Sequence, residues 1–143
     1  MAMGILRHLT SLDEDLWRIE SAGVWAREGN PAHLNVELIL REMGVDISRH
    51  RSRQVTRDML NEFDLVLVME LGHKEGLRMA FPDLANKVFM LSEIVGQRYD
   101  IVDPIGGTLA DFRETAQELE HILQEGSEKI LQLTRSHSNM EDV

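Results

Sequence analysis

One nearly unbroken apolar run, Asp64-Leu-Val-Leu-Val-Met69, limits the folds that this chain can adopt. Half-exposed strands alternate apolar and polar residues, whereas a strand covered on both faces is apolar throughout. A second run of this kind, Lys87-Val-Phe-Met-Leu91, follows a helical segment. Strands that alternate with helices predict an α/β domain, in which helices flank a parallel sheet with right-handed crossovers.

The other elements follow from hydrophobic periodicity and from cap and breaker residues. A third strand is predicted over residues 16–20, before the turn at Gly23. Ser92 is expected to cap a helical turn that ends at Gly96. Helices are predicted over residues 2–9, 31–43 (with Pro31 as the first helical residue), 56–63, 73–79 and 108–125, followed by one more packed turn near 130–133 and a polar tail over 136–143.

Composition excludes several classes of protein. The 143 residues are expected to form one domain over residues 1–135. A net charge of −10 argues against general nucleic-acid binding, and no apolar run approaches the roughly 18 residues of a membrane span. Cysteine is absent, so there is no disulfide, which fits a cytoplasmic location. The histidines show no H-x3-H or H-E-x-x-H spacing, so neither a metal nor another cofactor is expected.

The segment Ile101-Val-Asp-Pro-Ile-Gly-Gly-Thr108 carries the candidate catalytic residue. Pro104 disfavours helical geometry at Asp103, and the two glycines that follow permit backbone angles closed to other residues. Thr108 is expected to cap the long helix, with Asp111 completing a T-x-x-D box. The loop therefore presents a carboxylate on a fixed turn, although Asp-Pro followed by glycine is also common in ordinary turns.

Other polar residues are expected near this loop. In parallel sheets the chemistry lies beyond the carboxyl ends of the strands, where Ser21, Glu70 and Ser92 each follow a predicted strand. The segment Arg49-His-Arg-Ser-Arg53, with Arg57 just beyond it, forms a basic patch on an acidic protein. This patch is either a solvated connection or a rim that attracts anions.

Several motifs together resemble a bacterial low-molecular-weight protein tyrosine phosphatase, over residues 2 to about 125. They are Trp17-Arg-Ile-Glu-Ser-Ala-Gly23, Gly29-Asn-Pro31, Gly44-Val-Asp-Ile-Ser48, His50-Arg-Ser-Arg-Gln-Val-Thr56, Asp64-Leu-Val-Leu-Val-Met69 and Asp103-Pro-Ile-Gly-Gly107. The Asp-Pro-Ile-Gly-Gly-Thr version, with Asp111 and Arg113 after it, is also similar to the protein arginine phosphatases of that family. The resemblance implies a three-layer α/β fold and phosphorylated proteins, chiefly phosphotyrosine proteins, as substrates.

The resemblance also implies a two-stage mechanism at a C-x5-R loop. A cysteine thiolate attacks phosphorus, while N–H groups of the loop and the arginine hold the phosphate oxygens. Asp103 matches the general acid that protonates the leaving oxygen and then assists hydrolysis of the phosphocysteine. Ser21 and His50 match residues that brace the phosphate loop, Pro104 braces the acid loop, and Trp25 matches an aromatic residue at the pocket rim. The alternatives are a turn serine, a satisfied histidine and a packed tryptophan.

The chain departs from the family at the nucleophile. In the family, a strand and the sequence C-x5-R-S-P precede the helix that corresponds to residues 1–9, whereas this chain begins at that helix and has no cysteine. Acid catalysis alone contributes about 10²–10⁴-fold, so we expect this chain by itself to be inactive as a phosphatase. The leading hypothesis is a phosphatase-family chain whose start was lost or was assigned too late.

In the fold that the resemblance implies, the absent strand would lie inside the sheet, between the strands at 16–20 and 64–69. Losing about five buried residues, at roughly 1.5–3 kcal/mol each, would cost on the order of 7–15 kcal/mol, which is comparable to the whole stability of a domain. The strand edges left exposed would be open to a second copy of the chain, so a homo-oligomer is one way to fill the gap.

Two other functions stay open. The chain is alternatively a non-catalytic pseudophosphatase or interaction module, which binds phosphorylated ligands through a rim containing Arg49, Arg51 and Arg53. Within the enzyme class, the alternative is a protein arginine phosphatase. The sequence alone does not distinguish phosphotyrosine from phosphoarginine.

Overall fold

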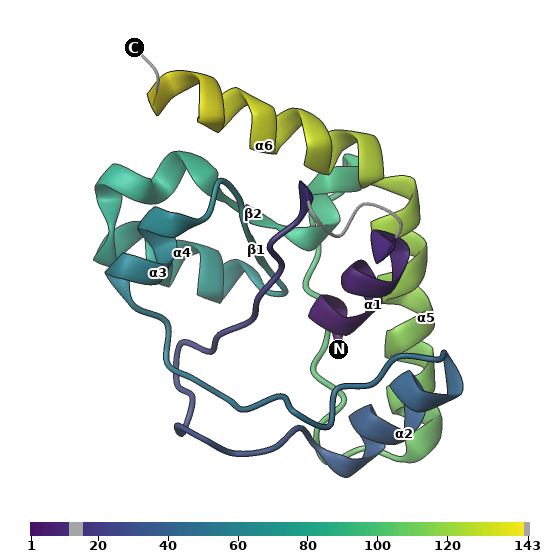
Figure 1. Ribbon diagram of the computed structural model, residues 1–143. Helices are drawn as coiled ribbons and strands as arrows, with labels where there is room; N and C mark the ends of the chain where they lie inside the picture. Colours follow the sequence, from purple (N-terminus) through teal and green to yellow (C-terminus); the bar gives the residue numbers. More distant parts are fainter. Residues whose placement is uncertain (12–15, 142–143) are drawn as a thin grey trace. The chain divides into compact units, whose positions relative to one another are not determined.

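The computed structural model describes residues 1–11 and 16–141 (Figure 1). The chain folds into two compact units. Unit 1 consists of Met1–Val55 and Asp103–Gln124, and unit 2 consists of Thr56–Val102 and Glu125–Val143. Unit 1 therefore holds the candidate acid, the loop-bracing residues and the rim tryptophan that the sequence predicted.

Unit 2 contains the parallel sheet. Strand β1 (Val66–Val68) pairs in parallel with β2 (Val88–Met90), with Val66 beside Val88. Helix α4 (Leu71–Ala80) and the 3₁₀ helix η2 (Pro82–Lys87) connect the strands, and α4 packs on both of them (Figure 1). This arrangement confirms the α/β fold and the parallel sheet that the two apolar runs predicted.

Two helix ends in unit 2 follow the sequence. Thr56 caps α3 (Arg57–Glu62), because its hydroxyl accepts a hydrogen bond from the N–H of Met59 at 3.2 Å. The 3₁₀ helix η3 (Leu91–Val95) ends at Gly96, whose φ of 73° lies in the left-handed region that favours glycine. Both ends were predicted from the residue types.

The predicted cap at Ser92 is wrong. Ser92 is buried inside η3, where its Oγ donates to the carbonyl of Tyr99 at 2.8 Å and accepts the N–H of Tyr99 at 3.2 Å. The Glu93 carboxylate instead accepts the N–H of Met90, at 2.7 Å, at the start of this helix. The hydroxyl of Ser92 satisfies the backbone of Tyr99, seven residues later, so it is not available as a cap.

In unit 1, the described helices are α1 (Ala2–Leu9), α2 (Leu34–Glu42) and α5 (Leu109–Glu125), as Figure 1 shows. Helix α1 approaches the end of α2 closely, because a Cβ added at Gly4 would lie 2.9 Å from Leu40 Cδ1. An alanine at this position of α1 would therefore force the side chain of Leu40 to shift. The predicted bounds of α1 are confirmed.

Helix α5 buries the apolar stripe that its sequence predicted. Phe112, Ala116, Leu119 and Leu123 are all buried, whereas Leu109 at the start of the stripe is 37% exposed. The stripe therefore begins one turn later than its spacing indicated, because the first turn of the helix lies beside the exposed Asp103 loop.

Helix α2 begins at Leu34 rather than at Pro31. His33 has extended backbone angles and caps the helix, with its Nδ1 accepting the N–H of Asn35 at 3.2 Å. The same ring stacks on Phe112 of α5, with 4.9 Å between ring centres. A histidine that is fixed by a tertiary contact thus sets the helix start, which Pro31 alone does not reveal.

Residues 17–20 form no strand, contrary to the prediction for 16–20. The backbone nearby makes a single isolated parallel bridge, between Gly23 and Gln54. The carbonyl of Ile19 accepts a hydrogen bond from Arg7 Nε at 2.9 Å, where a strand would offer its carbonyl to a neighbouring strand. A strand needs such a neighbour, which local sequence does not specify.

Helix α6 (Ser127–Glu141) extends into the segment that was predicted as a polar tail. Its residue Ile130 is buried, as the predicted packed turn required. The segment contains neither proline nor glycine, so its polarity does not end the helix. Residues 142–143 of the tail lie outside the described residues. None of the described helices is both long and apolar enough to cross a membrane.

We expect Phe112→Ala to lower the free energy of unfolding by about 3–5 kcal/mol, because it removes a buried ring and its stack on His33. Chemical denaturation measures this change. Leu34→Ala serves as a control, because Leu34 is 66% exposed and its loss should change stability by roughly 0.5 kcal/mol or less. Equal effects of the two substitutions would contradict the packing role of Phe112.

Candidate functional site

The Asp103 loop is fixed by hydrogen bonds of its own. The Asp103 carboxylate accepts the N–H of Ile105 at 3.0 Å, and the Pro104 carbonyl accepts the N–H of Gly107 at 2.9 Å. Gly106 has a φ of 87°, which a residue with a Cβ adopts only with strain. The side chain of Asp103 is exposed, so a braced carboxylate is open to a ligand.

Thr108 and Asp111 form the predicted box at the start of α5. The N–H and the hydroxyl of Thr108 donate to Asp111 Oδ2 at 2.6 and 2.8 Å, and the N–H of Asp111 donates to Thr108 Oγ1 at 3.3 Å. The bond from the Thr108 backbone, and then that from its hydroxyl, hold the pKa of Asp111 below its ordinary value. The box anchors the acid loop to the helix that follows it.

The Asp103 carboxylate acts on the amino end of α1. Burial lowers the pKa of the Met1 amino group, and the charge of Asp103 opposes this shift by favouring the ammonium form. The first N–H groups of a helix have no partner within it, so this end of α1 attracts anions. An exposed acid and an anion-attracting helix end therefore occur in the same part of unit 1.

Ser21 and His50, the predicted loop-bracing residues, line one hollow of about 430 Å³ in unit 1. We name it the basic hollow, because more cationic than anionic side chains line it. Its charged lining, apart from His50, consists of Arg7, Arg49, Arg51, Arg53, Glu20 and Asp46. Ser21 and His50 thus line the same hollow, whereas Asp103 and Pro104 do not belong to the lining.

Burial and surrounding cations act on His50. Burial lowers the pKa of His50, and the positive charges of the Met1 amino group and of Arg7, Arg53 and Arg51 lower it further. These are groups of α1 and of the segment that carries His50 itself. The imidazole is therefore held in its neutral form to a lower pH than a histidine in water.

Arginines of the basic hollow are fixed by contacts with the chain. Arg53 Nε donates to the carbonyl of Ser21 at 3.1 Å, and its Nη2 is bound to the carboxylate of Glu20. The bond from Arg53 holds the pKa of Glu20 below its ordinary value, with a smaller effect of Arg18. Arg51 Nη1 donates to the carbonyls of Ser48 and of His50, at 3.0 and 2.6 Å.

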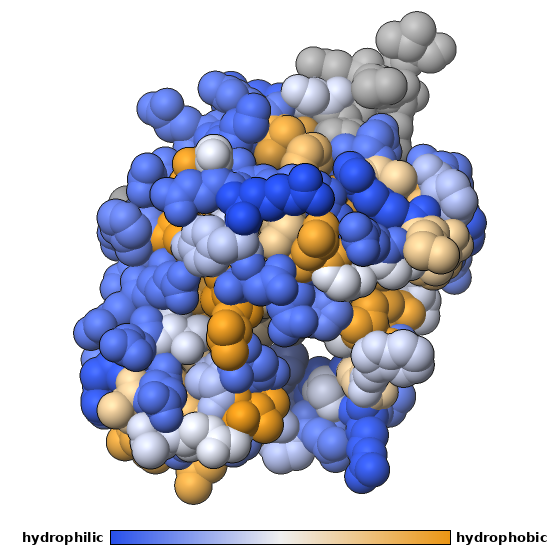
Figure 2. Space-filling view, turned by 180° about the vertical axis from the view of Figure 1, so that it is seen from behind, coloured by the Kyte–Doolittle hydropathy of each residue, from blue (hydrophilic) through white to orange (hydrophobic). Residues whose placement is uncertain are grey.

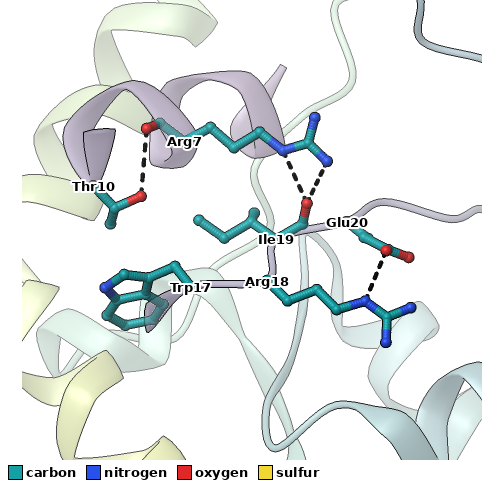
Figure 3. Close-up of a pocket in the computed structure, with 6 residues that line it drawn as sticks. All are labelled: Arg7, Thr10, Trp17, Arg18, Ile19 and Glu20. Atoms are coloured by element: carbon teal, nitrogen blue, oxygen red, sulfur yellow. Dashed lines mark hydrogen bonds and ion pairs between the residues drawn. The ribbon is translucent and has the colours of Figure 1, made fainter. Parts of the chain in front are cut away.

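A second hollow of about 310 Å³ shares Arg7 and Glu20 with the basic hollow. Figure 3 shows Arg7 reaching from α1 to the carbonyl of Ile19, while Arg18 Nε contacts Glu20 at 2.9 Å. In this view Trp17 lies below Ile19, on the side away from Arg7. Arg7 therefore connects α1 to the extended segment and contributes to both hollows.

Trp25 is held in solvent on a braced loop. Its side chain is 92% exposed, so it is not the packed tryptophan that was the alternative. Gln54 holds the backbone on both sides of it, because its Oε1 accepts the N–H of Ala26 at 3.0 Å and its Nε2 donates to the carbonyl of Val24 at 2.6 Å. Trp25 lines neither of the two hollows described above.

Two residues of this region were not identified from the sequence. Arg7 gave no usable signal, because its role consists of a contact with the carbonyl of Ile19, 12 positions away. Gln54 gave none, because its role consists of contacts with residues about 30 positions away. In the part of the chain that the structure describes, no three His, Asp or Glu side chains gather as metal ligands do.

Comparison with known proteins identifies one family throughout. The sequence model described as "low molecular weight phosphotyrosine protein phosphatase" matches residues 1–135. A protein-arginine-phosphatase of Geobacillus stearothermophilus is 35% identical over 113 residues, which cover 78% of this chain and 76% of that protein. A probable low molecular weight protein-tyrosine-phosphatase of Ralstonia nicotianae is 34% identical over 97 residues, which cover 68% of this chain and 66% of that protein.

A solved structure is similar as well. The low molecular weight protein tyrosine phosphatase of T. tengcongensis superposes with a TM-score of 0.85 at 37% sequence identity. The match covers 90% of this chain and 88% of that one. Sequence and structure therefore agree on the family that the motifs indicated.

We expect His50 to make stability depend on pH. Because its folded pKa is lowered, the unfolded chain takes up the proton first, so this contribution to stability is present above about pH 6.5 and is lost as the pH falls below it. His50→Gln should reduce the fall in the free energy of unfolding between about pH 7.5 and 5.5, as measured by denaturant titration. His8→Gln, at an exposed position of α1, should retain the fall; the same curve for all three proteins would contradict this role of His50.

We expect Gly107→Ala to destabilise the acid loop. An added Cβ would lie 2.7 Å from Asp111 Oδ2 and 3.0 Å from the Pro104 carbonyl, so the box at the start of α5 must shift, at a cost of about 0.5–2 kcal/mol. Gly76→Ala is the matched control, because nothing lies within 4 Å of its Cβ and alanine favours the helix. Chemical denaturation should show opposite signs for the two variants, and a stabilising Gly107→Ala would exclude the close contact.

Proposed function

Because this chain belongs to the low molecular weight phosphotyrosine protein phosphatase family, we propose that it takes part in removing phosphate groups from protein side chains, with Asp103 as the general acid. One observation carries the proposal. The exposed carboxylate of Asp103 sits on a braced turn, near enough to the amino end of α1 to act on the charge at Met1. A phosphate held at a helix amino end would thus have a proton donor beside it.

In this reaction Asp103 gives its proton to the leaving oxygen as the bond between phosphorus and that oxygen breaks. The carboxylate then accepts a proton from the water that attacks the phosphoenzyme, which restores the acid. Ser21 and His50 brace the phosphate-binding loop, Pro104 holds the turn of the acid, and Trp25 stands at the rim. These roles rest on the family resemblance and on the positions of the residues in unit 1.

The first step also needs a nucleophile, and the 143 residues contain no cysteine. A general acid supplies about 10²–10⁴-fold, whereas enzymes that transfer phosphoryl groups accelerate the reaction by far more. The chain of 143 residues by itself therefore does not turn over phosphoproteins. Complete chemistry requires a thiolate from residues outside this sequence.

The proposed substrate is a protein that carries phosphotyrosine, with phosphoarginine as the alternative. Relatives of both kinds are similar to the chain. Asp111 and Arg113, which the arginine-phosphatase version shares, are engaged inside unit 1, Asp111 in the box at α5 and Arg113 with both oxygens of Glu42 at 3.1 Å. Because both side chains make internal contacts, we propose that residues at the phosphate loop, and not Asp111 or Arg113, distinguish the two substrates.

Phosphate release tests the proposal in two proteins. The purified chain of 143 residues should release no phosphate above background from a phosphotyrosine peptide or from a phosphoarginine protein. A chain extended before Met1 by the strand and C-x5-R-S-P segment of a relative should be active. In the extended chain, Asp103→Asn should slow the first chemical step by about 10²–10⁴-fold, most strongly for substrates with poor leaving groups.

Asp58→Asn is the control for this change, because it removes one exposed carboxylate of unit 2. An Asp103→Asn variant as fast as its parent on a poor leaving group would remove Asp103 from the mechanism. Phosphate release by the chain of 143 residues, reduced by Asp103→Asn, would contradict its proposed inactivity. Association of two copies of the chain through exposed strand edges, which the sequence analysis expected, stays a prediction.

A further inference from the structure

One loop of unit 1 is closed at its base by backbone contacts at both ends. At one end, Gly23 forms an isolated parallel bridge with Gln54. At the other end, the N–H of Gly29 donates to the carbonyl of Ser52 at 2.8 Å. Trp25 lies between these two ends, and we name the segment from Gly23 to Gly29 the tryptophan loop.

The side chain of Gln54 holds the tryptophan loop directly before and after Trp25. Its Oε1 accepts the N–H of Ala26 at 3.0 Å, and its Nε2 donates to the carbonyl of Val24 at 2.6 Å. The backbone N–H of Gln54 also donates to Glu28 Oε1 at 2.6 Å. A side-chain amide offers both a donor and an acceptor, and only one orientation of this amide satisfies both partners.

These contacts fix the backbone of Trp25 and leave its indole in solvent. The two peptide groups that Gln54 binds meet at the Cα of Trp25, so their planes set the direction in which the side chain leaves the backbone. The side chain of Trp25 is 92% exposed, compared with 82% for Met79. Hydrophilic side chains dominate the face of the protein seen in Figure 2, with hydrophobic ones dispersed among them.

An exposed indole on a braced loop is suited to contact another polypeptide. Tryptophan contributes strongly to interfaces, because its large ring buries much apolar area and has only two side-chain torsions to restrict. A mobile loop would also lose backbone freedom on binding, which weakens the affinity. Because Gln54 already orders the backbone around Trp25, that loss is small here.

From these contacts we propose that Gln54 is a positioning residue for substrate recognition. It holds Trp25 as a preformed contact for the polypeptide around a phosphorylated side chain. The proposal rests on the proposed function, in which Trp25 stands at the rim of the site. Gln54 acts through Trp25 and not on the reacting atoms, so it affects the binding of a protein substrate and not the chemical step. A small phosphate ester has no polypeptide to contact Trp25, so its hydrolysis does not depend on Gln54.

Two substitutions and a control separate this role from general packing. Gln54→Met keeps an unbranched side chain of similar length but removes both side-chain hydrogen bonds. Gln54→Glu keeps an acceptor for the N–H of Ala26 but sets a carboxylate oxygen against the carbonyl of Val24. Gln117→Met is the matched control, because it makes the same change at an exposed position of α5 in unit 1.

Amide hydrogen exchange in the purified chain of 143 residues measures the bracing. The N–H of Ala26 loses its acceptor in Gln54→Met, so it should exchange about tenfold faster than in the parent, the effect of one lost hydrogen bond. Gln117→Met should leave this exchange unchanged. An unchanged rate for Ala26 in Gln54→Met would show that Gln54 does not hold the tryptophan loop.

The chain extended before Met1, described above, measures recognition with a phosphotyrosine peptide and with p-nitrophenyl phosphate. Gln54→Met should raise KM for the peptide by about threefold to tenfold, and should leave kcat and both constants for the small ester unchanged. Gln54→Glu should raise the peptide KM by less, and it decides the question if Gln54→Met fails to fold. Trp25→Ala should match Gln54→Met, and the double variant should lose nothing further, because both residues act through one contact. Equal effects on the two substrates, or losses that add in the double variant, would overturn the proposal.

The two proposals fail in different ways. An extended parent that hydrolyses neither substrate would contradict the proposed function. In that protein, quenching of Trp25 fluorescence by the peptide still measures affinity, with Trp17→Phe in the background because Trp17 is the only other tryptophan. Gln54→Met should weaken this binding by the same factor. Absence of binding, or equal binding by Gln54→Met and its parent, would overturn the role of Gln54.

Discussion

Arginine side chains hold the extended segment that carries Ser21, and the geometry of the candidate site depends on these contacts. The carbonyl of Ile19 is bound by Arg7, and the carbonyl of Ser21 is bound by Arg53 Nε at 3.1 Å. Backbone carbonyls that leave water on folding need a partner, and the segment is not part of a strand. The guanidinium groups therefore donate the hydrogen bonds that a neighbouring strand would donate to these carbonyls in a sheet.

The same arginines then serve both the fold and the basic hollow. Their contacts with backbone carbonyls fix where the charges lie, and several charges of one sign are thereby held close together. These charges contribute to the lowered pKa of His50, because burial and then the surrounding cations oppose a further positive charge on its ring. An anion in the basic hollow would relieve this repulsion, so the packing that supports the segment also favours a negatively charged ligand.

Local signals in the sequence identified the elements that depend on local physics. The apolar run at 64–69 predicted a parallel strand, and Thr108 marked the start of α5, because apolar runs and capping are set within a few residues. Only Val68 of β1 is buried, so the burial of the whole strand that the run also predicted is not found. The strand predicted at 16–20 was wrong, since pairing depends on a neighbour far along the chain. Arg7 and Gln54 act on backbone groups 12 and about 30 residues away, and no local pattern encodes such contacts.

The loop that carries Asp103 is built independently of any nucleophile. This loop is braced by its own turn and by the box at α5, so contacts among residues 103–111 hold the carboxylate that we propose as the acid. The hydrogen bonds of this loop and of the box at α5 do not involve a thiol group. The acid loop can therefore keep its geometry in a chain without cysteine, and its presence is evidence for the family rather than for turnover.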